Sequence, residues 1–205
     1  MTIDSDNKSI DFLFDIGNVI VHIDFISSLK RLIPEAIGNP EARLNRLLER
    51  KDEFEAGRLS SEDYFPWAAQ TIGFEGELEE FMEAWVDIFS PNQAMWDTIE
   101  SLHDAGHRLI LFSNINQPHI DYLQSQHPIF KCFTGGIFSY KTGHIKPENE
   151  IYQLAIREYK LVPERTAYID DLPANIEAGK KAGLICHQYC SDRHRDFLAW
   201  LSSIK

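Results

Sequence analysis

The sequence predicts an α/β protein: a Rossmann-like, three-layer α/β/α core around a parallel sheet, with a small all-helical cap inserted into it. From Pro91 onward, amphipathic segments alternate with short apolar runs, the pattern of a parallel sheet with helices on both faces. Between about Phe25 and Phe89 the apolar spacing is helical instead. We therefore assign residues 1–20 and 91–205 to the core and residues 21–90 to the cap.

Short apolar runs are expected to form the strands of the sheet. Helical spacing or turn residues separate each run from the next. Because the strands are expected to be parallel, their carboxyl ends should share one edge, where open α/β sheets bind their ligands. The expected strands are Ile10–Phe14, Arg108–Phe112, Gly136–Ser139, Thr166–Ile169 and Leu184–His187.

Composition excludes several classes of protein. Of the 205 residues, 43% are hydrophobic and 25% charged, as in globular proteins. The formal net charge of −12 argues against nucleic acid or an anionic membrane as a partner. No apolar run is long enough to span a membrane, and the first nine residues, with Asp4 and Asp6, do not resemble a signal peptide. Three cysteines suit a reducing compartment. We therefore expect a cytoplasmic monomer or homodimer.

Polar side chains recur where the predicted strands end. Asp15, the pair Ser113 and Asn114, and the pair Asp170 and Asp171 each follow an apolar run, and Lys146 lies between the third strand and the next helix. Three carboxylates at one sheet edge repel one another unless a cation lies between them, and all-oxygen ligation favours Mg²⁺. An ammonium group and neutral donors around a carboxylate nucleophile suit a phosphoryl dianion.

The motifs at these positions resemble those of the haloacid dehalogenase-like hydrolases. They are Asp-Ile-Gly-Asn-Val at 15–19, Phe-Ser-Asn at 112–114, Ile-Lys-Pro at 145–147 and Ile-Asp-Asp-Leu-Pro-Ala-Asn at 169–175. Within that group the chain is similar to sugar-phosphate phosphatases such as alpha-D-glucose-1-phosphate phosphatase, and to the phosphatase domain of soluble epoxide hydrolase. The resemblance covers nearly the whole chain, including a helical cap between the first two motifs.

The resemblance implies a role for each matching residue. Asp15 would be the nucleophile that becomes an aspartyl-phosphate, and it would also bind Mg²⁺ together with the backbone carbonyl of Gly17. Ser113 and Asn114 would bind the phosphoryl oxygens. Lys146 would orient Asp15 and neutralise the phosphate.

The fourth motif completes the implied metal site. Asp171 aligns with the metal-ligating aspartate of the family. Asp170 would be a second ligand or would support the ligands from behind. Asn175 would hold metal-bound water or Lys146.

Gly17 departs from the family pattern. Most phosphatases of the family carry a second aspartate at this position, which acts as general acid and then as general base. Losing such a group costs ~10²–10⁴-fold in rate. We expect His22, Asp24 or a hydroxyl of the substrate to take part of this role. His22 and Asp24 would then be among the residues that bind the substrate.

The predicted function is a Mg²⁺-dependent phosphatase acting on a small phosphorylated metabolite, such as a sugar phosphate. Two alternatives stay open: a phospho-ligand-binding protein whose turnover is lost or slow because of Gly17, and a 2-haloacid dehalogenase. Dehalogenases of this superfamily lack the acidic pair that Asp170 and Asp171 form here. A receiver domain carries similar residues, but with its acidic pair early and its lysine late.

Two other residue groups favour structural roles. The fifth strand would send Cys186 and His187 to opposite faces, so we do not expect them to bind zinc with Cys190 and His194. The aromatic residues between positions 54 and 85 are expected to form the core of the cap: Phe54, Tyr64, Phe65, Trp67, Phe81 and Trp85.

Overall fold

The core is a five-stranded parallel sheet in the order β5-β4-β1-β6-β7. A computed structural model describes residues 10–34 and 38–204. The central strand β1 pairs on one side with β4 and on the other with β6, so that Phe14 lies between Leu111 and Ile169. The strands are β1 (Asp11–Phe14), β4 (Arg108–Ser113), β5 (Gly136–Phe138), β6 (Thr166–Asp170) and β7 (Ile185–Gln188).

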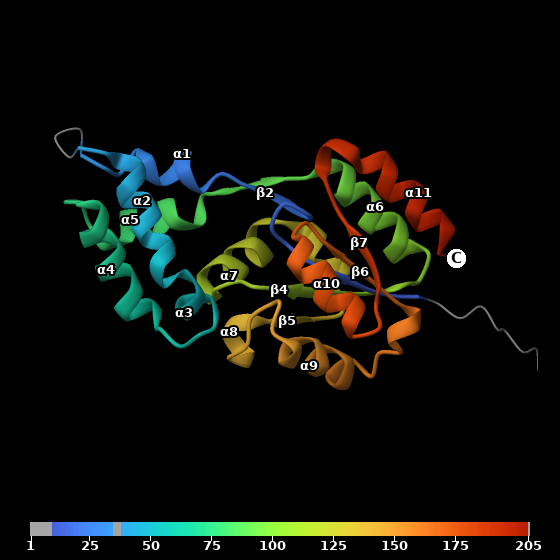
Figure 1. Ribbon diagram of the computed structural model, residues 1–205. Coiled ribbons are helices and arrows are strands. Elements are labelled where there is room, and N and C mark those ends of the chain that lie inside the picture. The colour runs from blue at the N-terminus through green and yellow to red at the C-terminus, as the bar shows by residue number, and fades with distance from the viewer. Residues whose placement is uncertain (1–9, 35–37, 205) are drawn as a thin grey trace, which may run out of the picture.

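Helices cover both faces of this sheet (Figure 1). Alternate residues of β1 point to opposite faces. Phe12 and Phe14 pack in one buried cluster with α6, α7 and α11, whereas Leu13 packs in the other with α9 and α10. The predicted α/β fold class is therefore confirmed. The helices are α6 (Gln93–Asp104), α7 (Gln117–Gln126), α8 (Ser139–Thr142), α9 (Asn149–Tyr159), α10 (Pro173–Lys181) and α11 (His194–Ser203).

Among the described residues, five α-helices form the cap, which lies to the left of the sheet in Figure 1. Their buried side chains make a hydrophobic cluster of their own, in which Phe54 stacks on Tyr64 with ring centroids 4.1 Å apart. The aromatic residues expected in the cap core all belong to or pack against this cluster. The boundaries at residues 20 and 90 stay a prediction, and residues 1–9 of the expected core lie outside the described residues. The cap helices are α1 (Phe25–Lys30), α2 (Pro40–Leu47), α3 (Lys51–Glu55), α4 (Ser61–Ile72) and α5 (Leu78–Val86).

A short antiparallel ribbon joins the cap to the core. It pairs β2 (Val21–Ile23) with β3 (Phe89–Pro91), and His22 lies opposite Ser90. We expected no strand here. Each strand is only three residues long and its partner is distant in the sequence, so no local pattern reveals the pairing.

The end of α3 packs closely against the core at α8. The backbone of Tyr140 leaves no room for a Cβ at Gly57, whose φ of +67° also favours glycine. The Ser139 hydroxyl donates to the carbonyl of Glu55, and the Arg58 guanidinium donates to the carbonyl of Gly143 over 2.9 Å. These contacts hold α3 beside the carboxyl edge of the sheet. Within the described ranges, no helix is both long and apolar enough to cross a membrane.

Candidate active site

Lys146 lies at the centre of the predicted site. Its Nζ donates to Asp15 Oδ1 over 2.8 Å, to Asp170 Oδ2 over 2.6 Å and to the carbonyl of Phe112 over 2.8 Å. The lysine is only 3% exposed. Burial alone would lower its pKa, but the two carboxylates outweigh burial and raise the pKa above the ordinary value. Lys146 is therefore a fixed positive charge that joins β1 to β6.

Asp170 is the fully buried anchor of this lysine. Its Oδ2 accepts from Lys146 and from the Tyr168 hydroxyl over 2.6 Å, and its Oδ1 accepts from the Leu172 N–H over 2.9 Å and from Asn175 Nδ2 over 3.0 Å. Burial would raise the pKa of Asp170, but the ion pair and these hydrogen bonds lower it. Both carboxylate oxygens are thus occupied by protein donors. Asn175 donates to both oxygens of Asp170 and thereby holds in place the carboxylate that binds Lys146.

Asp15 and Asp171 are less well neutralised. Oxygen atoms of Asp15, Asp170 and Asp171 all lie within 4.8 Å of one another. Burial raises the pKa of Asp15 to about 7, although Lys146 opposes the shift. Burial also raises the pKa of Asp171, against a 3.2 Å hydrogen bond from Asn18 Nδ2. One lysine thus faces three carboxylates, and a cation would relieve the excess negative charge.

The donor set fits Mg²⁺. All the available atoms are oxygens, which this hard cation prefers. Asp15 and Asp171 would hold it with the backbone carbonyl of Gly17, as the motif implies. The oxygens of Asp170 already accept hydrogen bonds from Lys146, Tyr168 and Leu172, so of the two roles expected for this residue the structure favours support of the ligands over direct ligation.

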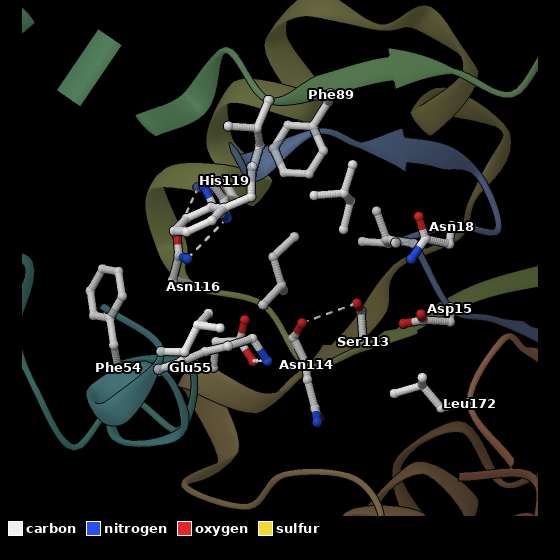
Figure 2. A pocket seen from close by; sticks show the side chains of 18 of the residues that line it. Asp15, Asn18, Phe54, Glu55, Phe89, Ser113, Asn114, Asn116, His119 and Leu172 are labelled. Carbon is white, nitrogen blue, oxygen red and sulfur yellow. Dashed lines mark hydrogen bonds and ion pairs between the residues drawn. The ribbon is translucent and has the colours of Figure 1, made fainter. Parts of the chain in front are cut away.

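Ser113 is the last residue of β4 and lies beside Asp15, and Asn114 follows it (Figure 2). Ser113 is buried, and its hydroxyl makes only a long 3.5 Å hydrogen bond to the carbonyl of Asn114. This hydroxyl can turn toward a ligand at little cost. The Asn114 amide accepts from the Lys146 N–H over 2.7 Å and donates to the Lys146 carbonyl over 2.9 Å. Its side chain therefore holds the loop that carries Lys146, and its contact with a phosphoryl group stays a prediction.

These residues form one end of a cavity of about 460 Å³ between the core and the cap. The cap contributes Lys51 and Glu55 from α3, and the core contributes Asn116, the N-cap residue of α7, and His119 from α7 itself. Sequence reasoning did not identify any of these four. Their positions depend on how the cap folds over the sheet edge, and the residues around them carry no motif that could have revealed them.

Neither His22 nor Asp24 lines this cavity. His22 and Ile23 point to opposite faces of β2, and Ile23 is the residue that lines the cavity. The Asp24 carboxylate caps α1 by accepting from the Ser27 N–H over 3.0 Å. The structure therefore gives no support to the expectation that these two residues take the place of the missing aspartate.

Gly17 borders the cavity beside Ile23. A Cβ built on Gly17 would come within 2.7 Å of Ile23 Cδ1. Ile23 thus occupies part of the space that an aspartate at position 17 would need.

Lys51 and Glu55 form an ion pair on the cap side of the cavity. Lys51 Nζ lies 2.9 Å from Glu55 Oε2, and the Glu55 side chain is 12% exposed. Burial raises the pKa of Glu55, while the ion pair with Lys51 opposes the shift. In Figure 2 Glu55 extends from the end of the cap helix toward the cavity that also holds Asp15.

His119 joins the core to the end of α5. One ring nitrogen lies 3.0 Å from Asn116 Nδ2 and the other lies 3.0 Å from the carbonyl of Trp85. Since Asn116 Nδ2 and the carbonyl are a donor and an acceptor, these contacts fit a neutral imidazole that carries its proton on Nε2. Burial lowers the pKa of His119 to about 4.

The cysteine and histidine group near the C-terminus does not form a cluster suited to a metal. In the described part of the chain, the residues grouped closely enough are Asp15, Asp170 and Asp171, and a partly exposed group of His144, Glu148 and Glu150. Burial raises the pKa of Cys186 to about 12, and the two ring nitrogens of His194 lie within hydrogen-bonding distance of Tyr189 and Thr98.

Comparison with known families now identifies the chain. Residues 12–183 match the family described as haloacid dehalogenase-like hydrolase. The chain belongs to this family of hydrolases. The match spans all four motifs and the cap, which confirms the resemblance inferred from the motifs.

Two curated relatives are phosphatases. The chain is 28% identical over 183 residues to D-ribitol-5-phosphate phosphatase of Bacteroides thetaiotaomicron, covering 84% of this chain and 88% of that protein. It is 23% identical over 138 residues to the sesquiterpene phosphatase astK of Aspergillus oryzae, covering 67% of this chain and 70% of that protein.

Solved structures share the fold. The family enzyme BT-2542 of B. thetaiotaomicron, in complex with magnesium and inorganic phosphate, has a TM-score of 0.78 at 17% identity and covers 93% of this chain and 98% of its own. A predicted HAD-like family hydrolase from Porphyromonas gingivalis has a TM-score of 0.75 at 25% identity, and the match covers 96% of this chain and 97% of that chain.

Proposed function

We propose that this protein is a Mg²⁺-dependent phosphatase that hydrolyses small phosphate monoesters through an aspartyl-phosphate on Asp15. The observation that carries the proposal is the contact of Lys146 Nζ with both Asp15 and Asp170 at the end of a ligand-sized cavity. Asp171 and Ser113 border the same end. The phosphatase relatives and the magnesium and phosphate complex of BT-2542 support the same reaction.

In the first step a carboxylate oxygen of Asp15 attacks phosphorus. The bond between phosphorus and the ester oxygen breaks, the alcohol leaves with a proton, and Asp15 becomes an acyl phosphate. Lys146 holds the attacking carboxylate and places positive charge beside the phosphoryl oxygens. Bound Mg²⁺ would supply further positive charge to the same oxygens.

In the second step water attacks phosphorus, the bond to Asp15 breaks, and inorganic phosphate leaves. The free carboxylate returns to its contact with Lys146. Asp170 does not react in either step; its role is to position Lys146 through the 2.6 Å ion pair.

Glu55 is our candidate for the proton that the leaving alcohol needs. It comes from the cap, lines the cavity, and has a raised pKa because it is buried. A Glu55→Gln variant should lower kcat/KM by ~10–10²-fold for alkyl phosphates and remove the limb of the pH profile that this group causes. A His22→Gln variant is the matched control. An equal loss in both variants would contradict the assignment.

The relatives differ in the alcohol that they release, one a polyol and the other a terpenoid. The sugar-phosphate prediction from the sequence is supported by the first of them. What the two share is a phosphate monoester of a small alcohol, and this is the substrate class that we propose.

Phosphate release tests the proposal directly. p-Nitrophenyl phosphate and a panel of phosphate esters should release phosphate with Mg²⁺ and not with EDTA, and the Asp15→Asn variant should be inactive. A burst of one equivalent without further release would favour the phospho-ligand-binding alternative. Halide release from 2-haloacids without phosphate release would favour a dehalogenase.

A further inference from the structure

We infer that the alcohol of the substrate has a largely apolar body, such as an alkyl, prenyl or aromatic group, and that the cavity beyond the phosphoryl site is built to hold it. This inference rests on the proposed function and narrows its substrate class. It departs from the sugar-phosphate prediction, because a sugar or polyol needs hydrogen-bonding partners along its whole length.

Most of the exposed large apolar side chains that the structure describes gather around this cavity. Seven large hydrophobic residues are exposed in the described part of the chain, and four of them line this one cavity. Exposed apolar surface gathered in one place marks a binding site. These four residues, which we call the rim, come from the ribbon, the cap and the core: Ile23 (41% exposed), Ile26 (55%), Leu48 (49%) and Leu172 (52%).

The walls behind this rim are apolar as well. They are mostly aromatic and aliphatic side chains from the cap, the ribbon and the loop that follows β4; in Figure 2 the labelled Phe54 comes from the cap helix and the labelled Phe89 from the ribbon. These residues are Phe25, Phe54, Trp85, Ile88, Phe89 and Ile115.

Most polar side chains of this region are already paired with the protein; the exception is the Trp85 indole N–H, which has no hydrogen-bond partner among the described residues but is itself buried from the cavity. The Asn116 amide bonds His119 through both its Oδ1 and its Nδ2, and the other nitrogen of His119 bonds the carbonyl of Trp85. The Tyr64 hydroxyl donates to the carbonyl of Leu47 over 3.3 Å. A hydroxyl-rich ligand would therefore lose its water without gaining equivalent partners.

The Lys51–Glu55 ion pair is the charged feature on the cap side, among the described residues that line the cavity. Glu55 is proposed to act at the ester oxygen, so Lys51 is the charged group of this pair that could contact the rest of the alcohol. An alcohol with an apolar body and a single polar attachment point matches this distribution of groups.

A homologous series of esters tests the inference. With Mg²⁺, kcat/KM is expected to rise by about four-fold for each added methylene from n-butyl to n-octyl phosphate. n-Octyl phosphate should exceed ribitol 5-phosphate and glucose 6-phosphate by at least about ten-fold. Equal or better hydrolysis of the polyol and sugar esters would overturn the inference.

Variants of the rim separate ligand binding from other roles. Leu48→Asn and Leu172→Asn should lower the ratio of kcat/KM for octyl phosphate to that for acetyl phosphate by about five- to ten-fold. The matched controls are Val162→Asn and Leu198→Asn, which change exposed apolar residues outside the cavity and should leave the ratio unchanged. An unchanged ratio in the rim variants would show that the rim serves cap closure and would overturn the inference.

Acetyl phosphate keeps the two proposals distinguishable, because it has almost no leaving-group body. Its Mg²⁺-dependent hydrolysis together with a preference for sugar esters would overturn only the inference on the substrate. Acetyl phosphate left intact by folded protein with Mg²⁺ would overturn the proposed function, and this inference with it.

Discussion

The two ends of the cavity are built from different parts of the chain and have opposite chemistry. The phosphoryl end is made of charged side chains that lie close together: Asp15, Lys146, Asp170 and Asp171. At the cap end, aromatic and aliphatic side chains form the walls and most polar atoms are paired with one another. The first end suits a dianion that every substrate of this reaction shares. The second distinguishes one alcohol from another.

This difference has a consequence for variants. A change at the phosphoryl end should affect every substrate alike, because all of them present the same phosphoryl group. A change at the cap end should alter the ranking of substrates.

Asp15→Asn should abolish turnover for every ester, with a loss of at least ~10⁴-fold in kcat, because the amide cannot form the acyl phosphate. The measurement is phosphate release with Mg²⁺. Asp11→Asn is the control on the same strand: Asp11 forms a partly exposed ion pair with Arg108 and lies outside the cavity. A rate in Asp15→Asn close to that of the wild type would contradict the role of Asp15 as the nucleophile.

Lys146→Met should destabilise the fold by about 3–5 kcal/mol, because it leaves Asp170 buried without its partner. Urea unfolding measures the effect. Adding Asp170→Asn to this variant should restore part of the lost stability, since the uncompensated charge is then removed. Lys141→Met, at an exposed position of α8, should change the free energy of unfolding by less than about 0.5 kcal/mol. Similar losses in both lysine variants would contradict the role given to Lys146.

These site residues could be foreseen because strand ends converge. Asp15, Ser113, Lys146 and Asp170 are distant in the sequence, but each follows or adjoins an apolar run that a parallel sheet brings to one edge. The fold class follows from the same alternation of strands and helices, whereas the short ribbon of β2 and β3 was not predicted.

The cap end could not be foreseen in the same way. Glu55 and His119 reach the cavity through long-range packing, Glu55 through the contact of α3 with α8 and His119 through the carbonyl of Trp85. No periodic pattern encodes such contacts. His22 and Asp24 are near Gly17 in the sequence. His22 nevertheless lies on the face of β2 opposite to Ile23, and Asp24 caps α1.

Gly17→Asp should raise kcat for alkyl phosphates by up to ~10²-fold, because it restores a carboxyl where the family carries its acid and base. The gain should be smaller for p-nitrophenyl phosphate, whose leaving group needs no proton. Ile23 must rotate to make room for the new side chain. Gly17→Asn has the same size without the acid. A rise of equal size in Gly17→Asn would show that proton transfer is not the cause.

His119 should make the fold sensitive to acid. Its pKa is about 4 in the folded protein, against an ordinary value of 6.5, because it is buried. The unfolded chain therefore binds the proton more tightly between these values, and stability falls as the pH drops through this range. From about pH 7.5 to about pH 5 the contribution lost is about 2 kcal/mol.

Urea unfolding at these two pH values measures this contribution. The His119→Gln variant should lack it, so its free energy of unfolding should fall by about 2 kcal/mol less than that of the wild type. The contacts of His119 lie at the cap end, so the effect should not depend on Mg²⁺. An identical fall in both proteins would contradict the neutral, buried state of this histidine.

The most direct test of the account is to trap the intermediate on Asp15. The wild-type protein is mixed with Mg²⁺ and acetyl phosphate, quenched with acid and reduced with borohydride, which converts an aspartyl-phosphate to homoserine. Peptide mass spectrometry then locates the modified residue. Homoserine is expected at position 15, dependent on Mg²⁺ and absent from Asp15→Asn. Hydrolysis of acetyl phosphate without homoserine at position 15, or with homoserine at another aspartate, would contradict it.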